Sequence, residues 1–198
     1  MAMVKIRFKI PDWLDRICAW PVLEYRKRKY GYPFRRIPLT DGKYTIVDPP
    51  DYYRFNSLDW CARQSHSGVF YAVKFNNTGV GPEIIALHRL IMGSPVGMLV
   101  DHSSGAGLDN RMANLRLATR AQNCCNKKKR KNTSSKYMGV YFAGYSGKWR
   151  AKIKHNKKTF YLGYFDNEID AAKAYDEAAK KYHTVFARLN FPEEAHVS

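Results

Sequence analysis

The chain has 198 residues, which is enough for one large domain or two small ones. It holds 34 Lys and Arg residues against 17 Asp and Glu, so its formal net charge is +17. A cationic excess of this size favours a polyanionic partner, because each phosphate that a basic side chain neutralises releases condensed counterions. We therefore expect a protein that binds nucleic acid.

Cysteine spacing and hydropathy exclude further classes. The four cysteines form no C-x-x-C pair, which excludes a structural zinc ribbon and leaves reduced thiols as the expectation. The longest apolar run, residues 84–100, contains His88 and Arg89 and is too short to span a bilayer. The N-terminal sequence lacks the apolar centre of a signal peptide. We expect a cytoplasmic protein without a membrane partner.

The first part of the chain predicts a basic extension. Residues 1–36 are rich in basic and aromatic side chains. Two interpretations stay open for them: an arm along a nucleic-acid backbone, or a solvated arm.

A β-rich region follows from residue 37. Asp41 and Gly42 stand between β-forming residues and predict a hairpin. Residues 49–60 predict a short capped helix, residues 69–75 a strand, and residues 75–82 a turn-rich loop.

Residues 84–92 have the apolar spacing of a helix, with Ile84, Leu87 and Ile91 turned inward. A Gly-Ser-Pro stretch ends this predicted helix.

The next segment predicts a strand, a loop, a second strand and a helix. The first strand ends in Asp101-His102, the second begins at Asn114, and Thr119 caps a helix that contains Asn123. Carboxylate and amide oxygens suit a hard divalent cation, and an imidazole accepts a proton. This order therefore supplies the groups that phosphodiester hydrolysis requires.

The segment resembles the HNH nucleases of the ββα-metal class, particularly their phage and homing-endonuclease branch. Asp101 stands one residue before His102, while Asn114 and Asn123 stand 12 and 21 residues after it. The resemblance implies that His102 is the catalytic general base and that Asn114 orients it. It also implies that Asp101 and Asn123 bind one divalent ion. Many relatives have His where Asn123 stands, and that histidine favours softer metals. Asn at this position therefore implies Mg²⁺ (or Mn²⁺).

Four neighbouring side chains leave alternatives open. Asn110 competes with Asn114 for the orienting role, although the spacing favours Asn114. Asn126 is either a supplementary ligand or, as we prefer, an exposed helix residue. Arg111 and Arg116 are predicted to contact DNA phosphate, which the planar guanidinium binds well.

A basic run follows in residues 127–134, the predicted linker. Like charges extend such a run, which is either a solvated spacer or, as we expect, a segment that lies over DNA phosphates or in the minor groove. The predicted contacts are Lys127, Lys128, Lys129 and Arg130.

The last part of the chain predicts a three-stranded sheet and a helix. The strands are YMGVYF, KWRAKIKH and KTFYLGYF, and the helix over residues 166–183 is capped by Asn167 or Asp166 and has an alanine-rich face.

These motifs, with the closing ARLNFP, resemble the AP2 (ethylene-response-factor) DNA-binding domain over residues 135–192. The resemblance implies that the sheet binds duplex DNA and that Trp149 packs in the core. The predicted DNA contacts on the sheet are Tyr141, Lys148, Lys152, Lys154 and Tyr161. Tyr141 stands where plant relatives have a base-reading Arg, which weakens any transfer of their recognition sequence.

The sequence thus predicts an α+β protein: a basic extension (1–36), a β-rich region with an HNH nuclease domain (37–126, its ββα hairpin near 96–126), a linker (127–134), and an AP2-like domain (135–192). The predicted function is metal-dependent nicking of duplex DNA. The alternative is a non-catalytic DNA-binding regulator with a relic HNH fold. Double-strand cleavage would require two chains, as in a homodimer on DNA, and a bacterial or phage-encoded, nucleoid-associated protein is expected.

Overall fold

The computed structural model describes residues 11–78, 81–126 and 133–192. The chain forms two compact units, of which one holds residues 1–94 and 106–116 and the other residues 95–105 and 117–198. The described residues include no helix long and apolar enough to cross a membrane.

The first unit begins with a helix that the sequence did not predict. Helix α1 (Asp12–Tyr30) buries none of its residues. It is held instead by Arg35 of strand β1, whose guanidinium forms a 2.9 Å ion pair with Asp15 and stacks 3.8 Å from the ring centroid of Tyr52. The hydrogen bond from Arg35 lowers the pKa of the Asp15 carboxyl. A polar and aromatic anchor, rather than an apolar face, thus fixes α1.

The predicted hairpin is confirmed. Strands β1 (Arg35–Pro38) and β2 (Tyr44–Val47) pair antiparallel, and the turn between them holds Asp41 and Gly42 at φ angles of 57° and 66°. Two consecutive positive φ angles are those of the turn type that Asp-Gly favours.

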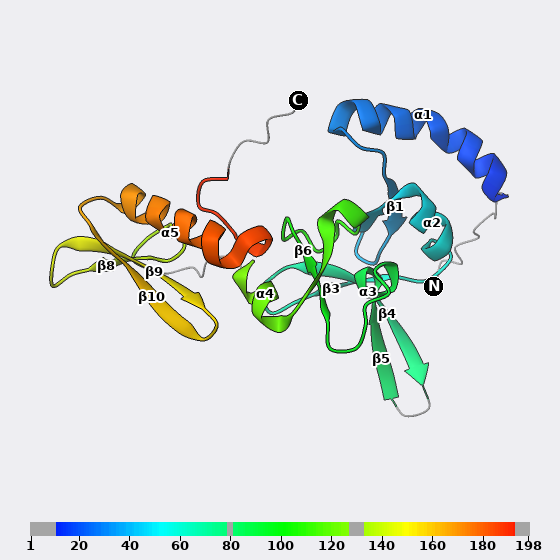
Figure 1. Cartoon of the computed structure of the whole chain (residues 1–198). Helices are drawn as coiled ribbons and strands as arrows, with labels where there is room; N and C mark the ends of the chain where they lie inside the picture. The colour runs from blue at the N-terminus through cyan, green and yellow to red at the C-terminus, as the bar shows by residue number, and fades with distance from the viewer. Residues whose placement is uncertain (1–10, 79–80, 127–132, 193–198) are drawn as a thin grey trace. The chain divides into compact units, whose positions relative to one another are not determined.

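The predicted short helix is also present, as α2 (Pro49–Phe55). A three-stranded antiparallel sheet follows in the order β3-β4-β5, made of β3 (Cys61–Gln64), β4 (Phe70–Thr78) and β5 (Gly81–Ala86). Strands β4 and β5 form a long hairpin (Figure 1).

The helix predicted over residues 84–92 was wrong in its first part. Helix α3 covers only Leu87–Ile91, because Ile84 and Ile85 pair with strand β4 instead. β-Branched side chains favour that pairing, and Ile84 is 44% exposed rather than turned inward. The loop predicted over residues 75–82 is correspondingly shorter.

The predicted order of two strands and a helix is present in residues 99–125. Strands β6 (Leu99–His102) and β7 (Leu115–Ala118) form a two-stranded sheet. The short 3-10 turn η1 (Met112–Asn114) comes directly before β7 in the chain. Helix α4 (Arg120–Cys125) begins at the predicted cap Thr119, whose hydroxyl accepts from the Gln122 amide in a capping box.

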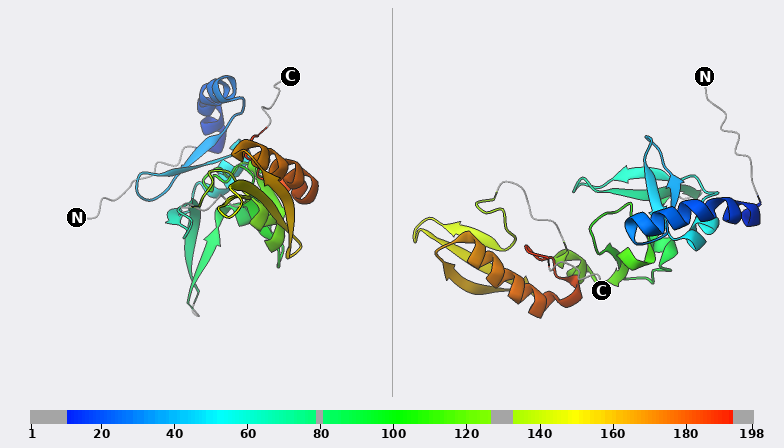
Figure 2. Two further views of the ribbon diagram at one scale, coloured as in Figure 1. Left: turned by 90° about the vertical axis from the view of Figure 1, so that its left-hand side faces the viewer. Right: turned by 90° about the horizontal axis from the view of Figure 1, so that it is seen from above.

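The C-terminal sheet and helix are as predicted. Strands β8 (Val140–Ala143), β9 (Lys148–His155) and β10 (Lys158–Phe165) pair antiparallel in the order β10-β9-β8. Helix α5 (Glu168–His183), followed by the turn η2 (Thr184–Phe186), is capped by Asn167 and lies across one face of the sheet (Figures 1 and 2). The fully buried residues between sheet and helix include Val140, Ala151, Ala171 and Ala172.

The ARLNFP segment closes this part of the fold. Asp176 of α5 is buried, and its two carboxylate oxygens accept from the backbone amides of Asn190 and Phe191, each at 2.8 Å. The Asn190 side chain in turn bonds both the amide and the carbonyl of Met138. The chain end is therefore tied to α5 and to the start of the sheet.

Gly139 permits the closest approach in this part of the fold. Its φ is 74°, and a Cβ at this position would collide with the ring of Tyr175 and lie 2.8 Å from the Lys152 carbonyl. The Tyr175 hydroxyl is buried, and burial raises its pKa to about 12. A glycine is required here for the helix to pack on the sheet.

Replacing Gly139 by Ala should lower the free energy of unfolding of the β8–β10 segment by about 3 kcal/mol, because it adds backbone strain to a steric clash. Gly144→Ala is the control, since a Cβ there meets open space; its effect should stay below about 0.5 kcal/mol. Hydrogen exchange of the β8–β10 amides in urea measures both. Equal stability of the two variants would contradict the packing of Tyr175 on Gly139.

Candidate functional site

The predicted Asp101-His102 pair lies at the end of strand β6. Both residues are buried, at 6% and 5% exposure. Asn126 is the C-terminal cap residue of helix α4, and its side chain contacts the end of β6. Its Nδ2 donates to the two carboxylate oxygens of Asp101 at 3.2 and 3.1 Å, and to the carbonyls of His102 at 2.9 Å and Ser103 at 3.3 Å.

This arrangement corrects one expectation. Asn126 was expected to be an exposed helix residue, yet it is 8% exposed and joins α4 to the strand. The expectation failed because nothing local in the helix signals a contact with residues 24 and 25 positions earlier in the chain.

Asn123, the second predicted metal ligand, lies on helix α4. Residues three apart on a helix are neighbours on its surface. Asn123 stands three residues before Asn126 and is half-buried.

Few side chains are available here as metal ligands. No group of three or more His, Cys, Asp and Glu side chains that could hold a metal ion occurs among the residues that the structure describes. A cation held here would receive oxygen ligands from one carboxylate and one amide, with water completing its coordination. That pattern fits Mg²⁺, which retains much of its hydration, better than a metal that needs a complete protein cage.

The loop before β7 belongs to the first unit, and two buried asparagines hold it. Asn110 is fully buried, and its Nδ2 donates to the Thr45 hydroxyl at 2.7 Å. Asn114 donates from Nδ2 to the carbonyl of Asp109 at 2.8 Å, so its side chain bridges the loop backbone. Asn110 therefore ties the loop to strand β2, whereas Asn114 shapes the loop itself.

Arg111 and Arg116 occupy different surroundings. The Arg111 guanidinium forms a two-point ion pair with Asp109 and stacks 3.4 Å from the ring centroid of Tyr32. The hydrogen bonds to Asp109 raise the Arg111 pKa. Arg116 lies half-buried on β7. The predicted contacts Lys127, Lys128, Lys129 and Arg130 lie outside the described residues.

The C-terminal sheet has one core face and one basic, aromatic face. Because side chains alternate along a strand, the residues between the buried positions Val140, Ala151 and Ile153 point away from α5. This outer face contains Tyr141, Lys148, Arg150, Lys152, Lys154, Tyr161 and Tyr164, which includes every sheet residue predicted to contact DNA.

Aromatic and cationic groups interleave across this face. The Lys152 ammonium lies 4.4 Å from the ring centroid of Tyr141, and the Arg150 guanidinium 5.6 Å from that of Tyr161. The Tyr164 hydroxyl shares a hydrogen bond with the Tyr145 hydroxyl, which lowers the pKa of Tyr164 and raises that of Tyr145.

Arg150 is the residue that the sequence reasoning missed. It stands between two predicted contacts on β9, and its Nε is buried with no hydrogen-bond partner among the described residues. Strict alternation along β9, from Lys148 to Lys154, would have identified it. Lys148 is instead partly engaged, in a 3.0 Å ion pair with Asp166.

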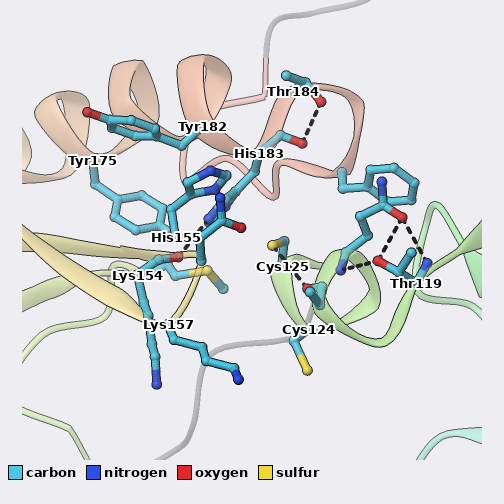
Figure 3. Close-up of a pocket in the computed structure, with 15 residues that line it drawn as sticks. Thr119, Cys124, Cys125, Lys154, His155, Lys157, Tyr175, Tyr182, His183 and Thr184 are labelled. Carbon is cyan, nitrogen blue, oxygen red and sulfur yellow. Dashed lines mark hydrogen bonds between the residues drawn. The ribbon is translucent and has the colours of Figure 1, made fainter.

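Figure 3 shows a pocket of the second unit and the bonds that fix the ends of its helices. Thr119 makes the capping box of α4, and the His183 ring bonds the carbonyl of Lys154 at 3.0 Å. Asp101, His102 and Asn123 do not line this pocket. It therefore supports no assignment of function.

Comparison with known proteins identifies both segments. Residues 86–124 match the family model "HNH endonuclease", and residues 135–184 match the family model "AP2 domain". A segment similar to HNH endonucleases is thus followed along the chain by a segment similar to AP2 domains. The HNH match includes Asp101, His102, Asn114 and Asn123, and the AP2 match includes the whole basic face.

The curated relatives are similar to the chain over a short stretch. The AP2-like ethylene-responsive transcription factor TOE2 of Arabidopsis thaliana is 43% identical over 61 residues, 31% of this chain and 13% of that protein. APETALA2-like protein 2 of Oryza sativa subsp. indica is also 43% identical over 61 residues, 14% of its length. Dehydration-responsive element-binding protein 2A of Arabidopsis thaliana is 48% identical over 48 residues, again 14% of its length.

The chain thus spans only about one seventh of these relatives. They are plant proteins, so they give no support to the expected bacterial or phage origin.

Asn126→Ala should lower the free energy of unfolding by about 2 kcal/mol, because a buried carboxylate and two carbonyls each lose one hydrogen-bond contact with the Asn126 amide. Asn123→Ala is the matched control: it lies one turn away and makes no side-chain hydrogen bond within the described part, so its effect should stay below about 0.5 kcal/mol. Urea unfolding measures both variants. A smaller loss for Asn126→Ala than for Asn123→Ala would contradict the contact with Asp101.

Proposed function

We propose that the chain is a metal-dependent endonuclease that hydrolyses phosphodiester bonds of duplex DNA, nicks one strand per active site, and is targeted by its AP2 domain. The observation that carries this proposal is the meeting of β6 and α4 through Asn126 and Asp101. It brings a carboxylate, an imidazole-bearing strand end and an asparagine-bearing helix together within a segment that matches the HNH endonuclease model.

Asp101 and Asn123 are the residues that would hold the divalent ion, through one carboxylate and one amide oxygen. Mg²⁺ (or Mn²⁺) fits this all-oxygen donor set. When bound, such an ion stabilises the negative charge that develops on the phosphate and on the leaving oxygen.

His102 is the general base of this proposal. Its imidazole accepts a proton from the water that attacks the phosphorus atom, a role to which imidazole is suited because it exchanges protons near neutral pH. Asn114, which shapes the loop before β7, would orient that imidazole.

Asn126 acts in this proposal as a positioning residue rather than as a ligand. Its Nδ2 faces the Asp101 carboxylate as a donor, and an amide nitrogen does not coordinate a cation. The bond fixes the rotation of the carboxylate and its distance from α4. Hydrogen bonds of this kind to a ligand are commonly worth 10- to 100-fold in metal affinity.

The outer face of the AP2 sheet would supply affinity for duplex DNA. Lysines position a protein on phosphates regardless of sequence, and Arg150 adds a planar guanidinium at the centre of the sheet. Guanine is read best by an Arg fork. Tyr141 therefore favours a recognition sequence different from that of relatives with Arg at this position.

The competing function is a DNA-binding regulator without catalysis. The AP2 relatives include a protein named as a transcription factor, and a regulator needs neither Asp101 nor His102. All four positions of the HNH resemblance keep the expected residues, namely Asp101, His102, Asn114 and Asn123, which favours the nuclease. Cleavage of both strands would require two chains on one DNA site.

With Mg²⁺, the purified protein should relax supercoiled plasmid, and chelation of the metal should stop it. His102→Ala should slow the reaction by about 10²- to 10⁴-fold, the usual contribution of a general base. His66→Ala is the control, because His66 is exposed in the turn after β3; its rate should equal that of wild type. A wild-type protein that binds plasmid but leaves it intact with both Mg²⁺ and Mn²⁺ is a regulator.

Arg150→Gln and Lys152→Gln should each weaken binding to duplex DNA and reduce the slope of log Kd against log salt concentration by about 1. Lys173→Gln removes the same charge from an exposed position on α5, away from the sheet face, and should leave the slope unchanged. Fluorescence anisotropy at several salt concentrations gives the slopes. Equal slopes for all three variants would exclude the sheet as the DNA-binding face.

A further inference from the structure

A second basic and aromatic surface lies in the first unit, outside both matched domains. Arg26 of α1 and Arg36 of β1 approach the same ring, that of Phe34. Their guanidinium carbons lie 4.5 and 5.9 Å from the Phe34 centroid. Arg36 also stacks 4.2 Å from the centroid of Tyr44, which is 45% exposed. Two cations therefore converge on one aromatic side chain.

Neither cation has an acidic partner in the described part of the chain. The nearby carboxylates are already occupied, since Asp15 pairs with Arg35 at 2.9 Å and Glu24 with Arg28 at 3.1 Å. The hydrogen bond of the Arg26 side chain goes to a neutral acceptor, the carbonyl of Phe34. Arg26 and Arg36 are thus cationic groups that the fold gathers without neutralising.

Gathering two like charges is unfavourable for the isolated chain. The pKa of Arg26 is lowered by burial and by the neighbouring charges of Arg36 and Arg35. Arg35 is the contrasting case, because Asp15 compensates its charge and Tyr52 covers it. Arg35 holds α1 in place, whereas the other two arginines repel each other and still face the same ring.

We propose that Arg26 and Arg36, held around Phe34, form a binding site for backbone phosphates of duplex DNA. An anion removes the repulsion between the two guanidiniums, and each guanidinium retains N–H groups in the planar fork that matches phosphate. Tyr44 adds a hydroxyl of the kind that contacts phosphate in DNA complexes. DNA is the partner chosen, because both matched domains belong to families that act on or bind it and the chain has a formal charge of +17.

The site rests on the proposed function only in its choice of DNA as the anion. It adds a contact in the first unit to those of the AP2 sheet. Because phosphate contacts position a protein without reading bases, this site would strengthen binding equally on all sequences.

The test is the salt dependence of binding by the full chain to a duplex of arbitrary sequence. The double variant Arg26→Gln/Arg36→Gln should reduce the slope of log Kd against log salt concentration by about 2 and weaken binding by about tenfold near 0.1 M salt. The control, Arg54→Gln/Lys180→Gln, removes the same charge from two exposed side chains already paired with Asp51 and Glu177. Its slope should stay close to that of wild type.

Two further variants keep the result decisive. Arg26→Lys/Arg36→Lys retains the charges and should retain most of the slope. If the double Gln variant does not fold, Arg36→Gln alone should reduce the slope by about 1, since Arg36 only stacks on rings in the described structure. A Gln variant with the same slope as the control would overturn the site and would leave an acidic protein partner as the alternative.

Failure of this site and failure of the nuclease assignment are distinguishable. Plasmid relaxation by wild type tests the nuclease, and it does not depend on Arg26 or Arg36 once the protein saturates the DNA. The salt slopes test the phosphate site, and they can be measured whether or not the DNA is cut.

Discussion

The hydrogen bonds from the Asn126 amide to the Asp101 carboxylate are the interaction on which the proposed site depends. A buried carboxylate without a donor would cost several kcal/mol. Asp101 and Asn126 are 25 residues apart in the sequence, so only a tertiary contact can bring them together. One amide does this while also satisfying the carbonyls of His102 and Ser103. The end of strand β6 and the end of helix α4 are therefore held together.

In the proposed function, the catalytic residues and the DNA-binding surfaces are different parts of the chain. The proposed chemistry uses few protein groups, one carboxylate, one imidazole and the asparagines around them. Affinity for DNA is assigned to surfaces elsewhere, the Tyr- and Lys-rich face of the AP2 sheet and the arginine pair around Phe34. Such a division suits a hydrolysis in which the metal and its water do most of the electrostatic work. It also explains a charge far larger than a small catalytic site would need.

The C-terminal domain could be predicted from sequence because its signals are local. Alternation along the strands, the Asn167 cap and the alanine face of α5 each act within a few residues. The turn at Asn156 and Lys157 likewise has two positive φ angles of its own. The hairpin at Asp41 and Gly42 was predicted for the same reason.

The sequence-based predictions that were wrong have a common cause, which is contact between residues distant in the sequence. Helix α1 lacks a buried apolar face and is held by Asp15 and Arg35, which are 20 residues apart. The segment at Ile84 and Ile85 has helical spacing but is taken into a sheet by strand β4. The local sequence predicts a surface position for Asn126, but in the structure its side chain is buried against the end of β6. In each case a partner distant in sequence decides the outcome over the local pattern.

The proposed catalytic residues were chosen from spacing. The structure adds the contact between Asn126 and Asp101, which joins the end of α4 to the end of β6.

The central claim is that the Asp101 carboxylate belongs to a divalent-ion site. Electron paramagnetic resonance of free Mn²⁺ during titration counts bound ions directly and requires no DNA and no cleavage. The account predicts one tight Mn²⁺ site per chain, and its loss in Asp101→Asn, which keeps the size of the side chain but removes the charge. Absence of a site in the wild-type protein, or an equally tight site in Asp101→Asn, would contradict it.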